Sequence, residues 1–107
     1  HANHLVDPKK TGVAEPENPR RHLTEFRHNR METLLNEQKP LNLSGMQEIL
    51  KDHEHQPQSL CRHRDDTLPG SQHTITKTAM IMDLEERKMW VTNGQPCKAE
   101  FEEFSFN

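Results

Sequence analysis

The sequence lacks tyrosine altogether and has only one tryptophan and two cysteines among its 107 residues. Two cysteines far apart in the chain, Cys61 and Cys97, do not make the disulfide framework of a small secreted domain. No apolar run approaches the roughly 20 residues that span a bilayer. The opening stretch, HANHLVDPKK, has no apolar segment typical of a signal peptide. We therefore expect a reducing, cytoplasmic compartment and no membrane partner.

Excess charge of either sign is also missing. The formal net charge is -3 and the isoelectric point is near 6.2. A nucleic-acid-binding chain usually carries a basic stripe, often with interleaved aromatic residues, and this sequence has none. This balance argues against a nucleic-acid partner and against an anionic membrane surface.

Core-forming residues are few. Hydrophobic residues make up 30% of the chain and the mean hydropathy is -1.07. Leucine, isoleucine, valine and phenylalanine together fall just under the roughly 20% level at which disorder becomes plausible. The low net charge and the periodic spacing of the apolar residues instead indicate folding. We expect a folded segment that exposes more apolar surface than it can bury by itself.

The first half of the chain has helical spacing. Asn18 followed by Pro19 is typical of a helix start, and Pro40 closes that segment. Ser44 with Gln47 three residues later predicts a capping box at the start of a second helix. The apolar and long side chains that set the helical stripes are Leu23, Phe26, Arg30, Leu34, Leu35, Met46, Ile49, Leu50 and His53.

The second half reads as strands. QSLCRH is short enough for one strand, and the stretch from 73 to 94 predicts two strands around a charged turn at 85–87, ended by Asn93–Gly94. The nearly continuous apolar run TAMIMDL is typical of a strand covered on both faces. A last extended segment carries Phe101, Phe104 and Phe106. Helices followed by strands predict an α+β fold with segregated layers.

Residues 52–66, DHEHQPQSLCRHRDD, concentrate possible metal ligands. His53, His55, Cys61 and His63 could supply three or four zinc ligands. On a strand, Cys61 and His63 would share one face, and Arg62 and Arg64 the other. However, the stretch has none of the familiar zinc spacings, and the two arginines would place positive charge near a dication. We therefore favour a helix end and loop with solvated imidazoles, and expect neither a metal nor a cofactor. A small metal-binding protein remains the less favoured alternative.

Three stretches together resemble a known family: ANHLVDP, LKDHEHQPQSLCRH and TITKTAMIMDLEERKMWVTNGQPCKAEFEEFSF. In this order they are similar to the C-terminal part of the acyl-coenzyme A:isopenicillin-N acyltransferases. These are N-terminal-nucleophile hydrolases, related to beta-alanyl-dopamine hydrolases and, more distantly, to choloylglycine hydrolases. The resemblance implies a four-layer αββα sandwich and a precursor that cleaves itself before a cysteine. That cysteine then becomes the nucleophile, and its free α-amine can accept the thiol proton.

The resemblance also implies two site residues. Asn3, in an Asn-His motif, would donate to the oxyanion of the tetrahedral intermediate. Arg62, in the SLCRH stretch, would lie beside the nucleophile and favour its thiolate or hold a substrate carboxylate. Taken alone, an asparagine near a terminus is usually a turn or cap residue, and a single arginine is usually a surface ion-pair partner. Cys61 and Cys97 are read as structural thiols.

The nucleophile itself is missing from these residues, since the chain opens beyond the position where it would lie. We therefore expect residues 1–107 to be a C-terminal fragment of one catalytic domain, inactive alone. Its predicted parts are an active-site strand end and loop (1–19), two helices (20–55) and antiparallel strands (58–107). Its partners would be a small-molecule N-acyl substrate and the rest of its own precursor. The alternative is a non-enzymatic binding or regulatory module with the same half-fold.

Overall fold

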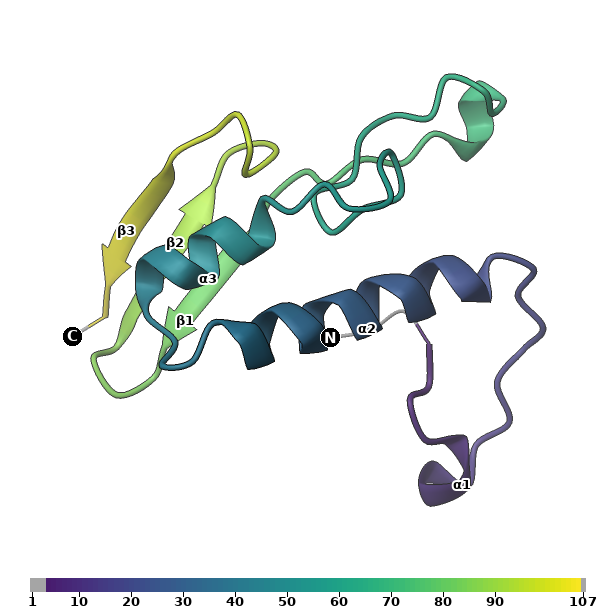
Figure 1. The fold of residues 1–107 in the computed structure, drawn as a ribbon, viewed down its shortest axis with the longest axis horizontal. Coiled ribbons are helices and arrows are strands. Elements are labelled where there is room, and N and C mark those ends of the chain that lie inside the picture. The colour runs from purple at the N-terminus through teal and green to yellow at the C-terminus, as the bar shows by residue number, and fades with distance from the viewer. Residues whose placement is uncertain (1–3, 107) are drawn as a thin grey trace.

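A computed structural model describes residues 4–106. Helices come first along the chain and strands last, as in the expected α+β order (Figure 1). The helices are α1 (Pro8–Thr11), α2 (Arg21–Glu37) and α3 (Leu43–Leu50), followed by a short 3-10 turn, η1 (Gly70–Gln72). The strands are β1 (Met80–Asp83), β2 (Lys88–Thr92) and β3 (Phe101–Ser105).

The two longer helices confirm the helical spacing, but their starting residues differ from the predicted ones. The Asn18 side chain accepts a hydrogen bond from the Arg20 backbone at 2.9 Å, which makes a turn before α2 rather than a cap on it. Asn42, not Ser44, caps α3, since its side chain accepts from the Gly45 backbone at 2.7 Å. Both asparagines satisfy backbone donors that the helix cannot satisfy itself.

The sheet is antiparallel in the order β1-β2-β3, and the predicted hairpin between β1 and β2 is confirmed. Asp83 accepts two backbone hydrogen bonds at 3.0 Å in the charged turn that follows β1. After β2 the chain turns at Gly94, whose φ of 122° suits a residue without a side chain. β3 then pairs with β2, with Phe104 opposite Met89 and Phe101 opposite Thr92.

The prediction of a strand at 58–63 is wrong. Within residues 4–106 this segment makes no ladder with another strand, and it runs as bends and irregular chain. Its backbone bonds go to nearby turns instead: the Cys61 amide donates to the Asp52 carbonyl and the His63 amide to the Pro57 carbonyl, both at 3.0 Å. The segment is therefore folded back on the end of α3 rather than added to the sheet.

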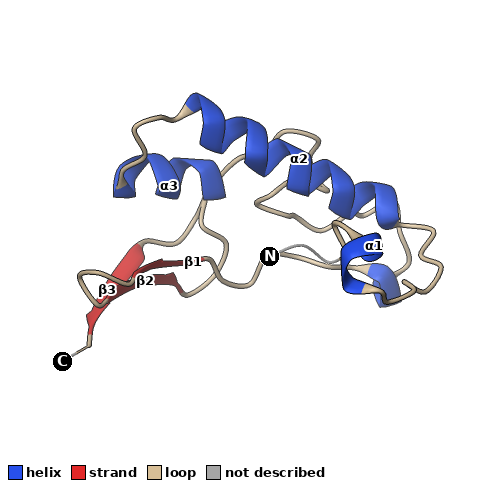
Figure 2. Cartoon of the chain, turned by 90° about the horizontal axis from the view of Figure 1, so that it is seen from below, coloured by secondary structure: helices blue, strands red, loops and turns tan. Residues whose placement is uncertain are grey.

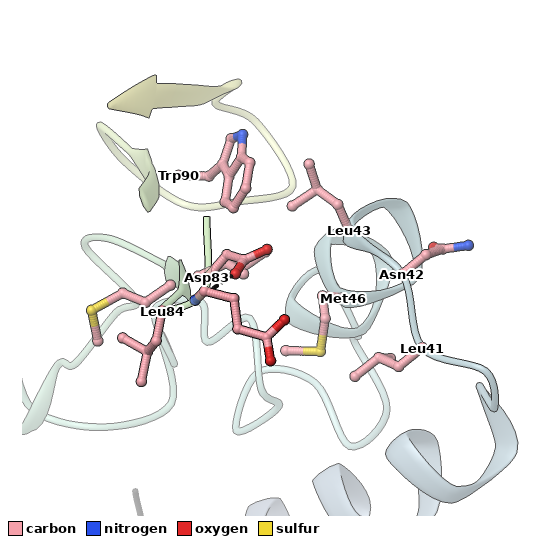
Figure 3. Close-up of a pocket in the computed structure, with 10 residues that line it drawn as sticks. Leu41, Asn42, Leu43, Met46, Asp83, Leu84 and Trp90 are labelled. Atoms are coloured by element: carbon pink, nitrogen blue, oxygen red, sulfur yellow. Dashed lines mark hydrogen bonds between the residues drawn. The ribbon is translucent and has the colours of Figure 1, made fainter. Parts of the chain in front are cut away.

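Helix α3 lies over one face of the sheet (Figure 2). Between them is an apolar cavity of about 380 Å³ lined in part by Leu43, Met46, Ile81 and Trp90. Figure 3 shows Leu43 and Met46 on the helix side of this cavity, with Trp90 across from them.

The opposite face of the sheet is also apolar, and no helix covers it within residues 4–106 (Figure 2). The register places Met82, Met89 and Phe104 side by side on this face, with Met80 and Val91 next to them. Met80, Met82 and Phe104 are respectively 49%, 63% and 47% exposed. The expectation that the apolar run at 78–84 is covered on both faces is therefore wrong for the described residues. We call this surface the open sheet face.

The core is correspondingly small. Among the described residues, the buried hydrophobic side chains are Ile49, Cys61 and Ala79. The radius of gyration is 15.5 Å, against about 13 Å expected for a compact chain of this length. The expectation of a segment with more apolar surface than it can bury is confirmed.

An ion pair fastens α2 to the segment after α3. Arg30 donates to both carboxylate oxygens of Asp52, at 3.0 and 2.8 Å. Arg30, by this hydrogen bond above all, lowers the pKa of Asp52. Two parallel hydrogen bonds between a guanidinium and a carboxylate are stronger than an ordinary surface pair.

We expect Asp52→Asn to lower the thermal midpoint at pH 7 by several degrees. Because the folded-state pKa of Asp52 is depressed, its contribution is present above the unfolded value of about 3.9 and is lost as the pH falls through the folded value. The difference between parent and variant should thus shrink below about pH 4. Thermal unfolding at a series of pH values measures this. The control is Asp66→Asn, which removes the exposed Arg64–Asp66 pair and should change little.

Candidate functional site

Asn3 lies outside the described residues, but its neighbour His4 is placed. The His4 ring contacts the buried Thr24 hydroxyl at 3.1 Å (Nδ1 to Oγ1) and meets the His28 ring edge-on, with centroids 5.7 Å apart. Both contacts are on α2. The described part of the Asn-His motif is therefore anchored on the same helix that carries Arg27.

Arg62 is half-buried, and its side chain leaves the chain on the side away from Cys61 and His63. Its Nη1 donates to the Thr74 hydroxyl at 2.9 Å, while its backbone amide donates to the Thr76 hydroxyl at 2.8 Å. The Thr76 amide donates in return to the Arg62 carbonyl at 3.0 Å. The residue is thus held at both backbone groups, which leaves most of the guanidinium available for another contact.

Arg62 and two other arginines line a cavity of about 180 Å³. Arg20, at the start of α2, and Arg27, two turns along it, line the same cavity with Leu23 and Asn18. We call Arg20, Arg27 and Arg62 the arginine triad. Among residues 4–106, none of the three forms an ion pair with a carboxylate. Their shared cavity therefore has positive charge without a fixed anion.

The electrostatics reflect this shortage of negative charge. Burial, followed by the charges of Arg62 and Arg20, lowers the pKa of Arg27 to about 10. Burial and the charge of Arg20 lower the pKa of Arg62 in the same way. The Arg27 Nη1 atom is buried and has no hydrogen-bond partner among residues 4–106. A buried guanidinium without an acceptor is costly, and an anion in the cavity would remove that cost.

A second polar cluster lies on the other side of Arg62. Cys61 and His63 flank Arg62 in sequence, and their Sγ and Nε2 atoms are 3.7 Å apart. The same His63 Nε2 lies 3.1 Å from His53 Nε2 and 3.4 Å from Cys97 Sγ. One ligand-type atom from each of these four residues lies within 4.8 Å of the others. We call these residues the thiol–imidazole cluster.

The cluster is partly enclosed. Cys61 is fully buried, Cys97 and His63 are half-buried and His53 is exposed. Burial in particular raises the pKa of the Cys61 thiol to about 11, and the Cys97 side chain acts in the same direction. Burial, with the nearby charges of His53 and Lys98, lowers the pKa of His63. At neutral pH these groups are therefore a thiol and a neutral imidazole.

His55, the remaining ligand of the sequence-based alternative, does not join the cluster. Its backbone is left-handed, with φ of 68°, and its ring packs on Phe26 with centroids 4.5 Å apart. Cys97 takes its place in the cluster. This exchange corrects the ligand set weighed from the sequence.

Sequence reasoning missed three of the residues that these two sites bring together: Arg20, Arg27 and Cys97. The arginines had a detectable signal, because positions 20, 23 and 27 share one helix face and put two charges beside an apolar residue. The only signal for Cys97 was the Gly-Gln-Pro turn that precedes it. No local pattern indicates that Cys97 contacts His63, which lies 34 residues earlier in the chain.

The family comparison covers both sites. Residues 1–98 match the model of the family described as acyl-coenzyme A:6-aminopenicillanic acid acyl-transferase. The chain belongs to this acyltransferase family. The match confirms the resemblance inferred from the sequence, and it includes Asn3, the arginine triad and the thiol–imidazole cluster. No curated protein matches the chain. Among the described residues, no helix is both long and apolar enough to cross a bilayer.

Membership in this acyltransferase family indicates an acyltransferase- or hydrolase-like activity of the full-length protein and a small-molecule acyl substrate. Arg62 is the one predicted site residue that the structure describes. The structure places Arg20 and Arg27 at the same cavity as Arg62, so positive charge and hydrogen-bond donors are concentrated there.

Proposed function

We propose that this chain is the C-terminal part of a cysteine-dependent amidohydrolase or acyltransferase acting on small N-acyl compounds. Asn3 donates to the oxyanion, and Arg62 stabilises negative charge beside the nucleophile or on the substrate. The observation that supports this most directly is the arginine triad: in a member of an acyltransferase family, three arginines line one cavity and none of them pairs with a carboxylate of residues 4–106.

The arginine triad is suited to an anionic group such as a substrate carboxylate. A guanidinium remains protonated at working pH and offers paired donors that match a carboxylate. Three such groups around a cavity of about 180 Å³ leave room for a carboxylate but not for a whole drug-sized ligand. We infer that the cavity holds one end of the substrate and that the scissile amide lies outside it.

The nucleophile is carried by another segment of the precursor and becomes N-terminal by self-cleavage. In the proposed reaction its thiolate attacks the amide carbonyl, and the α-amine accepts the thiol proton. The C–N bond then breaks, the amine leaves with a proton, and a thioester remains on the cysteine. Water or an acceptor amine cleaves the thioester and releases the sulfur. Cys61, fully buried and with a raised pKa, is poorly suited to that attack.

The open sheet face supports a larger, four-layer αββα assembly. Its methionine and phenylalanine side chains expose apolar area of the kind that a second sheet would cover at a spacing of about 10 Å. Helix α3 already covers the other face, as one outer layer of such a sandwich would. We infer that the rest of the precursor supplies the second sheet and its helices.

The proposal is tested by labelling the full-length protein with iodoacetamide while its hydrolysis of small N-acyl amino acids is followed. We expect one equivalent of label on an N-terminal cysteine outside residues 1–107, with loss of activity in step. Peptide mapping identifies the labelled residue. Label on Cys61 or Cys97 in step with inactivation would contradict the assignment of the nucleophile. A full-length protein that has neither an N-terminal cysteine nor amide-cleaving activity would favour the non-enzymatic binding module instead.

A further inference from the structure

We propose that His53, Cys61, His63 and Cys97 bind a zinc ion, and that this site is structural. The proposal is independent of the proposed reaction, because none of the four residues has a role in it. It rests on the convergence of two thiols and two imidazoles from three separate parts of the chain.

The three distances from His63 Nε2 are close to those of tetrahedral zinc, and the remaining pairs of ligand atoms lie within 4.8 Å. Zinc–sulfur bonds of about 2.3 Å and zinc–nitrogen bonds of about 2.05 Å imply ligand separations of about 3.3 Å between nitrogens and 3.6 Å between nitrogen and sulfur. The observed values are 3.1 Å between the two imidazole nitrogens, and 3.4 and 3.7 Å from His63 Nε2 to the two sulfurs. Two cysteines and two histidines are also a common ligand set of closed structural zinc sites.

The backbone brings these ligands together without any metal-binding motif in the sequence. The Cys61 amide bonds to the Asp52 carbonyl, which places Cys61 next to the segment that bears His53. Cys61 and His63 point the same way, since their Sγ and Nε2 atoms are 3.7 Å apart. The turn after β2 then delivers Cys97, and Gln95 in that turn donates to the Arg62 carbonyl at 2.8 Å.

The charges around the cluster are compatible with a dication. Two thiolates and two neutral imidazoles around Zn²⁺ sum to zero charge. Arg62, the cation that argued against a metal from sequence alone, points away toward Thr74, and Arg64 pairs with Asp66. Lys98 stands near the cluster and would be attracted to coordinated thiolates.

One side chain must move for zinc to bind. The Gln95 amide lies 3.2 Å from His63 Nδ1, and as a donor it keeps the imidazole proton on Nε2, the atom that faces the cluster. Coordination through Nε2 requires that proton on Nδ1, so the Gln95 amide has to turn or withdraw.

Zinc here would stabilise a part of the fold that has little else to hold it. From 51 to 79 the only regular element is η1, and the core is small. Two of the ligands are the immediate neighbours of Arg62. A metal held by Cys61 and His63 would therefore fix the backbone from which Arg62 reaches the cavity that it shares with Arg20 and Arg27.

The experiment uses the full-length protein, purified under reducing, metal-free conditions and titrated with Co²⁺ and then Zn²⁺. We expect one equivalent of Co²⁺ to give the visible bands of a tetrahedral site and thiolate-to-cobalt charge-transfer absorption, with Zn²⁺ bleaching both. His53→Ala should weaken binding roughly 100-fold or more, since even the loss of an outer partner of a ligand costs 10- to 100-fold. His55→Ala is the matched control and should bind as the parent does.

His53 is exposed, so its variant keeps the test valid if Cys61→Ser or Cys97→Ser does not fold. Absence of charge-transfer absorption in the reduced parent would overturn the proposal, and so would equal affinity in His53→Ala and the parent. A Cys61–Cys97 disulfide would also overturn the proposal. It would lower the intact mass of protein purified without a reductant by about 2 Da, and this native protein would hold no metal.

Discussion

Replacing Arg62 by Met in the full-length protein is expected to raise KM for substrates that carry a carboxylate roughly 10- to 100-fold. The loss of a hydrogen bond to a charged group costs about 1.5–3 kcal/mol, which corresponds to that range. Met is close in length to Arg, so the apolar part of the side chain is largely kept while the charge is lost. Kinetics with a carboxylate substrate and with its neutral amide analogue measure the effect, and the analogue should lose much less.

The matched control is Arg64→Met, two residues along the chain, where the guanidinium is exposed and paired with Asp66. It should leave KM unchanged. Arg62→Lys should recover only part of the loss, because an ammonium keeps the charge without the paired donors. If Arg62→Met leaves both KM and the pH–rate profile as in the parent, Arg62 has neither of its two proposed roles.

The arginine triad also predicts that the charge of Arg27 contributes to binding an anion but not to the stability of the fold. Arg27 is half-buried, its Nη1 has no partner in the described part of the chain, and two other cations are nearby. Replacing such a charge by an apolar residue of similar size is often neutral or stabilising. Sites that bind charge are commonly kept at some cost to the fold in this way. Anion binding therefore explains the triad better than a contribution to the stability of the fold does.

The sequence indicated the elements with strong local patterns. Helices α2 and α3 and the β1–β2 hairpin follow from helical spacing and from turn residues at 85–87 and 93–94, and these are interactions within a few residues. The helix starts differ because Asn18 and Asn42 accept the backbone amides of Arg20 and Gly45, and such local side-chain bonds set the chain in other positions than the predicted caps. The strand at 58–63 could not be distinguished by pattern, since an extended chain alternates its side chains whether or not a partner strand exists.

That alternation explains why the grouping of the side chains at 61–63 was predicted better than their backbone. The sequence placed Cys61 and His63 on one side and Arg62 on the other, and the structure confirms this separation although the segment is not a strand. Cys97 and Arg27 reach the sites through tertiary contacts, which no local spacing encodes. The arginine triad and the thiol–imidazole cluster are thus both products of the fold around one short, predictable segment.

Asn3→Ala is expected to lower kcat about 10²- to 10³-fold with little change in KM, the usual loss when one oxyanion donor is removed. The physical reason is that negative charge on the carbonyl oxygen develops only as the thiolate attacks. A neutral amide donor stabilises that charge without itself being a buried ion. The role proposed for Asn3 rests on the resemblance of its Asn-His motif to that of the acyltransferases, and the neighbouring His4 is anchored on α2.

Steady-state kinetics on the full-length protein measure this, with Asn36→Ala on the exposed side of α2 as the matched control. In the proposed maturation, self-cleavage also passes through a tetrahedral intermediate, so fully matured protein is isolated before the two kcat values are compared. The split between kcat and KM distinguishes an oxyanion donor from a residue that only shapes the loop, since loop damage would raise KM as well. Activity of Asn3→Ala within threefold of the parent would remove Asn3 from the oxyanion site and leave the arginine triad as the part of the active site that this chain provides.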